Sequence, residues 1–572
     1  MNSPRPEAWT GPAISIEDLS FAYRGSEQKA LAGINLELRD GQFAVIMGHG
    51  GAGKSTLCYC LNALIPKFFK GSYEGRVLVK GIEAGTSKVY DMSRLVGLVF
   101  QDFESQLFST NVELEVAFGP ENYGVPREEI RRRVDRYLTF VRLAELRNRE
   151  PASLSGGQKQ RLAIASVLAM EPEVLVMDEP TTDLDPIGRD EVLSVAEELE
   201  RQGRTLLIVD HEPETAQGAD LVFLMKEGHL VRQGPPREVL TDVPLVLDCG
   251  VMPPQVVELF HRLDGPELPW TVEEALHLFR EARLRLKPGA HDLLRGMDAT
   301  RAGRVRDEVI LETRGLGFVY EEGRVEALRD VDLRIRAGEF VAIIGQNGSG
   351  KTTLAKQFNG LLHPTRGEVL VDGASTRALS RAALARAVGY VFQNPDHQIF
   401  ARTVREEVAF GPRNFGMDEA EIEERVAEAL RVVGLEGYEE RDPFALTKGE
   451  RQRVAVASVL ATRPRVVILD EPTTGLDYPQ QRRMMEMLDT LNRMGHTIII
   501  ITHSMWVVTE YATRTLVMKD GRVIRDGPTR EVFADEEALA EAFLKPPPIV
   551  RLGNRLGVTA LTVDEMLEVV AR

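Results

Sequence analysis

The sequence predicts an α/β protein made of two tandem copies of one domain, in which helices cover a parallel β-sheet. The first observation is an ordered internal repeat, since GHGGAGKST from Gly48 returns as GQNGSGKTT from Gly345 and VMDEPTTDLD returns as ILDEPTTGLD. The second is a set of short β-branched runs, such as FAVIMG, VLVMDE and TLLIVD, each followed by Gly, Asp or His and then by helical sequence. The third is the length of 572 residues, which allows three or four compact units.

The repeat also sets the expected domain boundaries. Lys54 and Lys351 of the Gly-rich segments are 297 residues apart, whereas Asp178 and Asp470 are 292 apart, so the copies differ by a small insertion. Each copy is followed by a fainter repeat, PPQVVELFHRL with TVEEALHLF and PPPIVRLGNRL with TVDEMLEVV, which predicts a small helical extension. The segment between the halves has Gly, Pro and mixed charge without apolar periodicity, which predicts a linker. The expected divisions are a first domain at 13–245, its extension at 246–285, a linker at 286–306, a second domain at 307–535 and its extension at 536–572.

Composition restricts the class of partner. The net charge of −17 argues against broad binding to nucleic-acid phosphates or anionic lipid. No apolar run reaches the roughly eighteen residues that a membrane-spanning helix needs, and the start MNSPRPEAWTGP lacks the layout of a secretory signal. We therefore expect a cytosolic chain that acts at a membrane only through partners. Three cysteines fit a reducing compartment, no spacing among them suggests zinc, and Cys58 and Cys60 favour buried packing.

Two segments have the pattern G-x-x-x-x-G-K-S/T, each after an apolar strand and before helical sequence, which is the context of a phosphate-binding P-loop. Glycines let backbone N–H groups curl around the phosphates, while Lys54 and Lys351 reach the outer phosphates and Ser55 and Thr352 reach a magnesium ion. The expected phosphate-binding residues are Gly48, His49, Gly50, Gly51, Ala52, Gly53, Lys54, Ser55 and Thr56 in the first copy, and Gly345, Gln346, Asn347, Gly348, Ser349, Gly350, Lys351, Thr352 and Thr353 in the second.

Two carboxylates end a buried apolar run in each copy, VLVMDE and VVILDE. The first, Asp178 or Asp470, is placed to hold magnesium through water, and the second, Glu179 or Glu471, can polarise the attacking water. The alternative, a pair of acidic caps on the next helix, loses weight beside a phosphate-binding loop.

A histidine follows another β-branched run in each copy, His211 after LLIVD and His503 after IIIIT. At that place a neutral imidazole can contact the terminal phosphate. A single such histidine is more often structural, but its repetition at a constant offset favours a catalytic role.

LSGGQKQR from Leu154 opens an alanine-rich helix, so Ser155 and the amides after it present a helix N-terminus to an anion. The P-loop, LSGGQ, DEPTT and the histidine, in this order, resemble the ATP-binding cassette superfamily over nearly the whole of both halves. The resemblance implies an ATPase that uses ATP and Mg²⁺, with cassettes made of a RecA-like parallel sheet core, an antiparallel β part and a helical subdomain. It also implies head-to-tail pairing of the two halves within one chain, so that each ATP is held by one half's P-loop and the other half's LSGGQ segment.

The same resemblance assigns further residues. Tyr23 and Tyr320 are expected to stack on adenine, although aromatic packing is the alternative. Gln101 and Gln393 are expected to sense the nucleotide, as catalytic residues that also contribute to the metal site. The expected nucleotide contacts from the helix N-termini are Ser155, Gly156, Gly157 and Gln158 in the first copy and Thr447 and Gly449 in the second.

The second copy departs from the LSGGQ pattern, because it has LTKGE from Leu446. Threonine keeps the hydroxyl, but Lys448 replaces a glycine and Glu450 brings a negative charge towards a polyanion. Crosswise pairing would place this segment opposite the first P-loop, so we expect a variant ATP site at Lys54 and a consensus site at Lys351. Both sites keep the glutamate and the histidine, and we therefore expect unequal sites rather than a dead one.

The segments QDFESQLF and QNPDHQIF, with EVAFGP in both copies, resemble the ATPases of energy-coupling factor (ECF) transporters, which import vitamins and metal ions. This resemblance implies an energy-coupling subunit at the cytoplasmic face of the cell membrane. Its implied partners are a transmembrane coupling protein and a separate membrane-embedded substrate-binding protein. The residues implied to lie beside the groove for the partner's coupling helix are Gln106, Leu107, Phe108, Gln398, Ile399 and Phe400. Core packing of the apolar members is an equal alternative.

Two other functions remain as alternatives. A soluble tandem cassette that acts on ribosomes relies on a basic helical linker, whereas residues 242 to 308 contain nine Lys and Arg against twelve Asp and Glu. A fused ATPase of a sugar importer is the other alternative, although we find no equivalent of the doubled-glutamine segments in that class.

Overall fold

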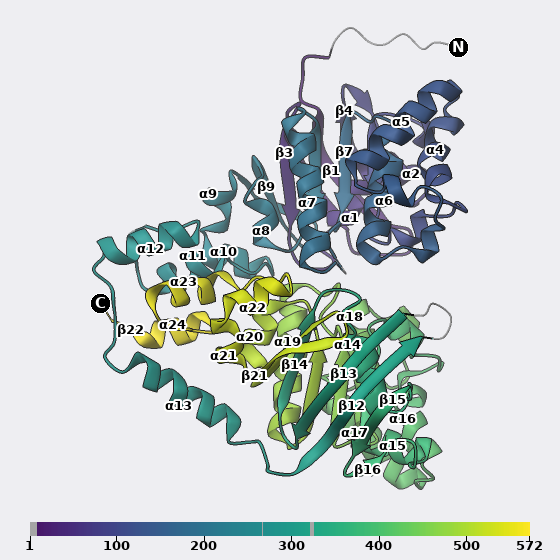
Figure 1. Cartoon of the computed structure of the whole chain (residues 1–572). Coiled ribbons are helices and arrows are strands. Elements are labelled where there is room, and N and C mark those ends of the chain that lie inside the picture. The colour runs from purple at the N-terminus through teal and green to yellow at the C-terminus, as the bar shows by residue number, and fades with distance from the viewer. Residues whose placement is uncertain (1–8, 183, 266, 321–324, 572) are drawn as a thin grey trace. The chain divides into compact units, whose positions relative to one another are not determined.

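The computed structural model describes residues 9–182, 184–265, 267–320 and 325–571 (Figure 1). The chain divides into two compact units. The first ends at Glu258 and takes in Asp477–Pro479, and the second runs from Leu259 to Leu476 and continues from Gln480.

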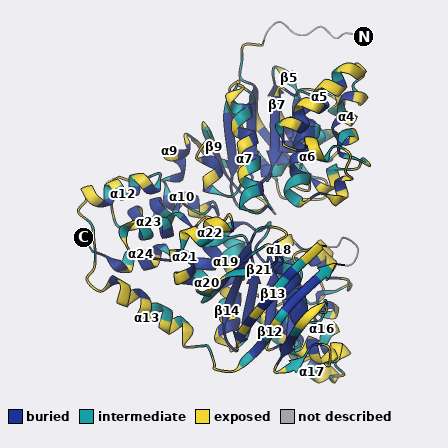
Figure 2. Ribbon diagram, viewed as in Figure 1, coloured by how far each residue is buried: buried dark blue, intermediate teal, exposed yellow. Residues whose placement is uncertain are grey.

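The first unit is organised around a six-stranded sheet with the order β10-β9-β3-β8-β7-β6, in which only β10 runs antiparallel to its neighbour. Every residue of β3, β7 and β8 is buried, because helices on both faces of a parallel sheet demand continuous apolar strands (Figure 2). The strands are β3 (Phe43–Met47), β6 (Val96–Val99), β7 (Val174–Asp178), β8 (Thr205–Val209), β9 (Leu221–Lys226) and β10 (His229–Gly234).

An antiparallel sheet and a helical part complete this unit. The sheet has the order β2-β1-β4-β5, and β2 alternates buried and exposed residues as a strand with one wet face should. The helical part consists of α4, α5 and α6, which contact one another. The strands are β1 (Ile14–Tyr23), β2 (Leu31–Leu38), β4 (Gly71–Val79) and β5 (Ile82–Glu83). The helices are α1 (Lys54–Leu61), α2 (Leu64–Lys67), α3 (Val89–Met92), α4 (Val112–Asn122), α5 (Arg127–Phe140), α6 (Gly156–Leu168), α7 (Pro186–Arg201), α8 (Pro213–Ala216), α9 (Pro236–Leu240) and α10 (Val243–Asp248).

The second unit repeats the arrangement strand for strand, with a six-stranded sheet β17-β18-β19-β14-β20-β21 and an antiparallel sheet β13-β12-β15-β16. The predicted α/β fold of two equivalent cassettes is confirmed. The strands are β12 (Val309–Tyr320), β13 (Val325–Arg336), β14 (Phe340–Gly345), β15 (Arg366–Val371), β16 (Ala374–Ser375), β17 (Val388–Val391), β18 (Val466–Asp470), β19 (Thr497–Ile501), β20 (Arg514–Lys519) and β21 (Arg522–Pro528). The helices are α14 (Lys351–Phe358), α15 (Arg381–Ala387), α16 (Val404–Asn414), α17 (Glu419–Val432), α18 (Lys448–Leu460), α19 (Tyr478–Arg493), α20 (Met505–Tyr511), α21 (Thr529–Ala534) and α22 (Glu536–Glu541).

The second extension and the part of the first extension that follows Glu258 fold against each other inside the second unit. Helix α12 contacts α23, and the short strand β11 pairs with β22 at the end of the described chain. An ion pair of 2.7 Å joins Arg555 of α23 to Glu273 of α12. The elements are α11 (Gln255–Arg262), α12 (Val272–Glu281), β11 (Arg285–Leu286), α23 (Pro548–Leu556), α24 (Val563–Val569) and β22 (Val570–Ala571).

The expected linker at 286–306 contains a helix, α13 (Ala290–Ala302), which contacts α24. Only Ala290 and Leu294 of α13 are buried, so the segment has too few apolar contacts to show a helical period. Arg530 fixes this region by binding both Asp298 of α13 and Glu565 of α24.

The three cysteines, Cys58, Cys60 and Cys249, are free and buried, as packing residues would be. Among the described residues, no helix has the length and apolarity to cross a bilayer.

Candidate functional site

A loop with left-handed glycines joins β3 to α1 in the first unit and β14 to α14 in the second. Gly53 has φ 97° and caps α1, and Gly350 has φ 101° and caps α14. A Cβ at Gly53 would lie 2.4 Å from the Ala30 carbonyl oxygen, and one at Gly350 would lie 2.5 Å from that of Ala327. Only glycine fits at these two positions, which lets the backbone of each loop turn tightly into the helix that follows.

A buried lysine closes each loop. Lys54 Nζ donates to the carbonyl oxygens of Gly48 and His49 at 2.8 and 2.9 Å. Lys351 Nζ donates to those of Gly345 and Gln346, both at 2.8 Å. Burial lowers the pKa of Lys54, and the nearby carboxylates Glu179 and Asp178 oppose that effect. Each ammonium group is therefore held beside the loop by weak carbonyl partners that a phosphate can replace.

The predicted catalytic glutamate of the first unit, Glu179, contacts both of the other predicted catalytic residues, His211 and Gln101. Glu179 Oε1 lies 2.7 Å from His211 Nε2, and Glu179 Oε2 accepts from Gln101 Nε2 at 2.7 Å. Burial alone would raise the pKa of Glu179, but the bond and charge of His211 bring it below its ordinary value. The glutamate is held ionised, as a general base must be.

The second unit has a looser version of this arrangement. Glu471 Oε1 lies 2.9 Å from His503 Nε2, whereas Gln393 is exposed and makes no hydrogen bond to Glu471 in the described structure. Both glutamates adopt left-handed backbone angles, with φ 49° at Glu179 and 50° at Glu471. This uncommon conformation, at equivalent positions, indicates that the fold fixes where the carboxylates point.

The aspartates expected to hold magnesium lie at the carboxyl ends of β7 and β18. The Thr352 hydroxyl donates to Asp470 Oδ2 at 2.9 Å, and Tyr390 donates to the same oxygen at 2.8 Å. Neither buried oxygen of Asp178 has a hydrogen-bond donor in place among the described residues, although the Ser55 hydroxyl is close enough to lower its pKa. Burial is the stronger effect and raises the pKa of Asp178 to about 6; it also raises that of Asp470. Buried carboxylate oxygens beside a hydroxyl fit a hydrated Mg²⁺ ion, which prefers oxygen ligands and keeps several waters.

The two tyrosines expected at adenine occupy matching positions at the ends of β1 and β12. Tyr23 contacts Thr56 through a hydroxyl pair of 3.1 Å, and Tyr320 contacts Thr353 in the same way. Burial raises the pKa of Tyr23. Tyr320 is 41 % exposed, so its ring is open to a ligand. Stacking on adenine stays a prediction for both residues.

The LSGGQ and LTKGE segments both form helix N-termini closed by a capping box. Ser155 caps α6 and exchanges hydrogen bonds with Gln158, and Thr447 caps α18 and exchanges them with Glu450. The Glu450 carboxylate accepts from the Thr447 amide and hydroxyl at 2.9 and 2.8 Å and from the Tyr438 hydroxyl at 2.9 Å. The effect of its charge on a bound nucleotide stays a prediction. The carboxylate of Glu450, which replaces the glutamine of LSGGQ, therefore binds its own loop. A carboxylate is stabilised near a helix N-terminus.

The doubled-glutamine segments present an aromatic side chain in each unit. Gln106 accepts from the Phe100 amide at 3.2 Å, and Gln398 accepts from that of Phe392 at 3.3 Å, so the second glutamine acts as a backbone clamp. Beyond it, Phe108 and Phe400 are 61 % and 60 % exposed.

Each exposed phenylalanine is paired with another from the EVAFGP helix. The ring centroids of Phe108 and Phe118 are 4.5 Å apart, and those of Phe400 and Phe410 are 4.7 Å apart. Leu107 is half-buried, and Ile399 is only 4 % exposed and packs in the core. The sequence left core packing and surface exposure open for these apolar residues. In the structure the aliphatic residue of each segment is the more buried one, and the phenylalanine after it is exposed.

The glutamate of EVAFGP was not predicted to have a role. Glu115 Oε2 accepts from the amides of Phe108 and Ser109 at 3.0 and 2.7 Å, and Glu407 Oε2 accepts from those of Phe400 and Ala401 at 3.0 and 2.9 Å. The available sequence signal was the recurrence of this glutamate directly before the apolar VAF run in both copies, and a buried charge there needs such partners.

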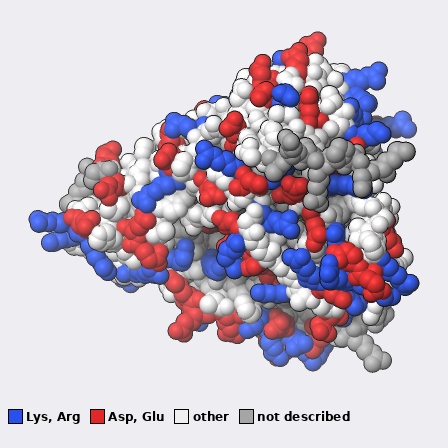
Figure 3. Space-filling view, turned by 90° about the horizontal axis from the view of Figure 1, so that it is seen from above, with Lys and Arg blue, Asp and Glu red and all other residues white. Residues whose placement is uncertain are grey.

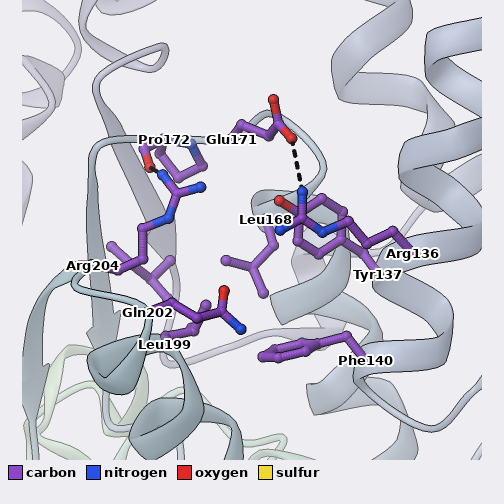
Figure 4. A pocket seen from close by; sticks show the side chains of 10 residues that line it. Arg136, Tyr137, Phe140, Leu168, Glu171, Pro172, Leu199, Gln202 and Arg204 are labelled. Atoms are coloured by element: carbon purple, nitrogen blue, oxygen red, sulfur yellow. Dashed lines mark hydrogen bonds and ion pairs between the residues drawn. The ribbon is translucent and has the colours of Figure 1, made fainter.

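A separate pocket lies beside α5 in the first unit (Figure 4). Its side chains include Arg136, which reaches Glu171 at 3.5 Å, and Arg204, which donates to the Pro172 carbonyl oxygen at 3.2 Å. Its space of about 30 Å³ is that of one water molecule, so it does not hold a nucleotide.

Comparison with known proteins agrees with this geometry. The sequence model of the ABC transporter family matches residues 31–182 and 328–474. A proposed ABC transporter ATP-binding protein of Caldanaerobacter subterraneus subsp. tengcongensis is 54 % identical over 98 % of this chain and 99 % of its own length. A similarly described protein of Methanosarcina acetivorans is 40 % identical over 99 % of this chain and 94 % of its own length.

Among solved structures, cbiO1 from Clostridium perfringens, part of the ABC transporter complex cbiONQ, is 39 % identical over 41 % of this chain and 94 % of its own, with a TM-score of 0.38. A match of that extent does not assign a partner or a substrate. The family match falls on both repeats and includes both P-loops and both predicted magnesium aspartates. The chain belongs to the ABC transporter family and carries two of its ATP-binding cassettes, which are ATPases that use ATP with Mg²⁺.

Proposed function

We propose that this chain is the ATP-hydrolysing energy-coupling subunit of an ECF-type membrane importer, of the class that takes up vitamins or metal ions. The observation that carries the proposal is the pair of displayed phenylalanines in each cassette, Phe108 with Phe118 and Phe400 with Phe410. Each pair follows a doubled-glutamine segment, the sequence feature that resembles ECF ATPases.

Each cassette has the residues for the ATPase reaction. The P-loop amides and Lys54 or Lys351 would bind the phosphates, and Asp178 with Ser55 or Asp470 with Thr352 would hold the metal. Bound Mg²⁺ supplies charge that offsets the phosphate oxygens during transfer. Glu179 or Glu471 would accept the proton of the attacking water, and the adjacent His211 or His503 would contact the terminal phosphate.

The two ATP sites are proposed to be composite and unequal. Crosswise pairing would join the first P-loop to the Thr447 and Gly449 segment, and the second P-loop to Ser155 and Gly157. Lys448, with its charged side chain, then faces the first site where the regular segment has a glycine. The second site, which has the regular LSGGQ segment, carries most of the turnover in this proposal.

Coupling to the membrane would use the displayed phenylalanines. An aromatic pair that faces solvent leaves apolar surface in contact with water. Burying that surface under a partner helix would stabilise the complex by about 25 cal/mol per Å². Closure of the cassettes on two ATP molecules would then move the helices seated on these pairs. The chain would lie at the cytoplasmic face of the cell membrane through a transmembrane coupling protein, with the substrate chosen by a separate membrane-embedded binding protein.

The test is recovery of that partner from cells. The wild-type chain and a Phe108→Ala/Phe400→Ala variant are purified in gentle detergent, and co-purifying polypeptides are identified by mass spectrometry. We expect a polytopic membrane protein with the wild type and its loss from the variant. Phe543→Ala is the matched control, since Phe543 is 52 % exposed but lies in the second extension.

Recovery of ribosomal proteins instead would favour the translation-factor alternative and contradict the proposal. On the face shown in Figure 3, Lys and Arg side chains are interspersed with Asp and Glu rather than gathered, which supports a protein partner over RNA. A partner set that lacks a membrane-embedded binding protein and includes a sugar-importer permease would favour the other alternative.

A further inference from the structure

A tyrosine distinguishes the metal aspartate of the second cassette from that of the first. Tyr390 lies on β17, where it is aligned with Ile468 of β18, and Leu98 lies at the equivalent place on β6, aligned with Val176 of β7. Both side chains are buried, with 7 % and 6 % exposed. The strands β6 and β17 have the sequences VGLV and VGYV, so they differ at this one position.

The tyrosine hydroxyl contacts the aspartate directly. Tyr390 donates to Asp470 Oδ2 at 2.8 Å, and the Thr352 hydroxyl donates to the same oxygen at 2.9 Å and lies 3.2 Å from Oδ1. Two donors on one oxygen fix the carboxylate plane and leave Oδ1 the freer of the two. A hydrogen bond to a charged acceptor is stronger than a neutral one and resists rotation of the group.

The first cassette lacks this restraint. Leu98 has no hydrogen-bonding group, and neither oxygen of Asp178 has a donor in place within the described part of the chain. Its carboxylate is also buried, and its neighbours are the Ser55 hydroxyl and the charged groups of Lys54, Glu179 and His211.

We propose that Tyr390 is a positioning residue that pre-orients Asp470 for the magnesium ion of the second ATP site, and that the first site lacks this device because Leu98 occupies the place. The inference rests on the proposed metal role of Asp470. If Tyr390 has this role, the two ATP sites differ because of a residue within the second cassette. That difference does not depend on which P-loop the LTKGE segment faces.

The test is binding of Mn²⁺, a spectroscopic substitute for Mg²⁺, to the full chain with ADP, followed by electron paramagnetic resonance. Tyr390→Phe removes only the hydroxyl. We expect one of the two Mn²⁺ sites to weaken roughly 10- to 100-fold, as loss of a hydrogen bond to a charged group allows. The other Mn²⁺ site, and ADP binding in EDTA, stay as in the wild type. Tyr137→Phe, on helix α5 of the first unit's helical part, is the matched control for removing the hydroxyl of a buried tyrosine.

Asp470→Asn separates this inference from the proposed metal site. If Asp470→Asn weakens one Mn²⁺ site and Tyr390→Phe does not, the positioning role is wrong and the metal role stands. If neither variant weakens a site, both are wrong. Equal weakening of the two sites in Tyr390→Phe would show a general loss of structure and would also overturn the inference.

Discussion

Arg530 is the residue whose loss we expect to loosen the paired extensions most. Its guanidinium donates to both oxygens of Asp298 at 2.7 and 2.8 Å and to both of Glu565 at 2.8 and 3.0 Å. The Arg530 side chain is 12 % exposed and that of Glu565 is 3 % exposed. Arg530→Met keeps an unbranched apolar stem of similar width and removes the charge and the bidentate bonds.

Removing one member of a buried ion pair costs about 3–5 kcal/mol, chiefly because the partner is left charged and buried. The lower end applies here, because Glu565 keeps Arg301 at 3.4 Å and the Leu561 amide at 2.7 Å, while Asp298 is 34 % exposed. We therefore expect Arg530→Met to lower the opening free energy of α13 and α24 by about 3 kcal/mol. Adding Glu565→Met should recover much of this loss, since the uncompensated charge is then gone.

Hydrogen exchange resolved by peptide is the appropriate assay, because a chain of several domains has no single unfolding transition. Faster exchange is expected in 290–302 and 563–569, with little change in the six-stranded sheets. Arg555→Met is the control, because its ion pair with Glu273 is 49 % and 66 % exposed and should contribute under about 1 kcal/mol. Unchanged exchange in α13 and α24 of Arg530→Met would refute the reasoning.

The other predictions concern the ATP sites and the membrane surface. Glu471→Gln should lower steady-state ATP turnover more than Glu179→Gln, with a loss at the altered site on the order of 100- to 1000-fold, and equal losses would contradict unequal sites. Asp178→Asn should stabilise the metal-free, nucleotide-free protein above pH 6. Folding raises the pKa of this carboxyl from 3.8 to about 6, so its ionised form costs roughly 3 kcal/mol at neutral pH, and the cost disappears below about pH 4. Melting temperatures from pH 4 to 8 would check this, and a gain independent of pH would contradict it. Glu407→Ala should reduce recovery of the membrane partner about as much as Phe400→Ala. The variant keeps Phe400 but removes the carboxylate that accepts from the Phe400 amide. Full recovery of the partner would show that this hydrogen bond is dispensable.

The sequence was sufficient to predict the features that depend on short local patterns, namely strands and phosphate-binding loops. An ordered repeat, buried β-branched runs and P-loops predicted three parallel strands of each six-stranded sheet, β3, β7 and β8 in the first and β14, β18 and β19 in the second, and placed Lys54, Glu179 and His211 at one edge. Parallel strands put their carboxyl ends together, which is why residues far apart in the chain could be grouped without a structure.

Features that depend on contacts between distant segments were not predictable. The linker helix α13 has few buried residues, so its stability comes from Arg530 and α24 rather than from its own periodicity. The bond from Tyr390 to Asp470 joins residues 80 apart, and a tyrosine in an apolar strand reads as a packing residue. Ile399 and Phe400 are both apolar, so the sequence does not tell which one is exposed; in the structure Glu407 binds the Phe400 amide and the Phe400 ring lies on the surface.

The pairing of the two extensions has a consequence during synthesis. Helix α12 ends at Glu281 and its partner α23 begins at Pro548, so roughly 270 residues must be translated before the partner exists. At about 5–20 residues per second, the apolar face of α12, formed by Val272, Ala275 and Phe279, waits uncovered for roughly 13 to 55 s. Until α23 has been made, the nascent first half therefore exposes an apolar helix face, the kind of surface that makes incompletely folded chains prone to aggregate.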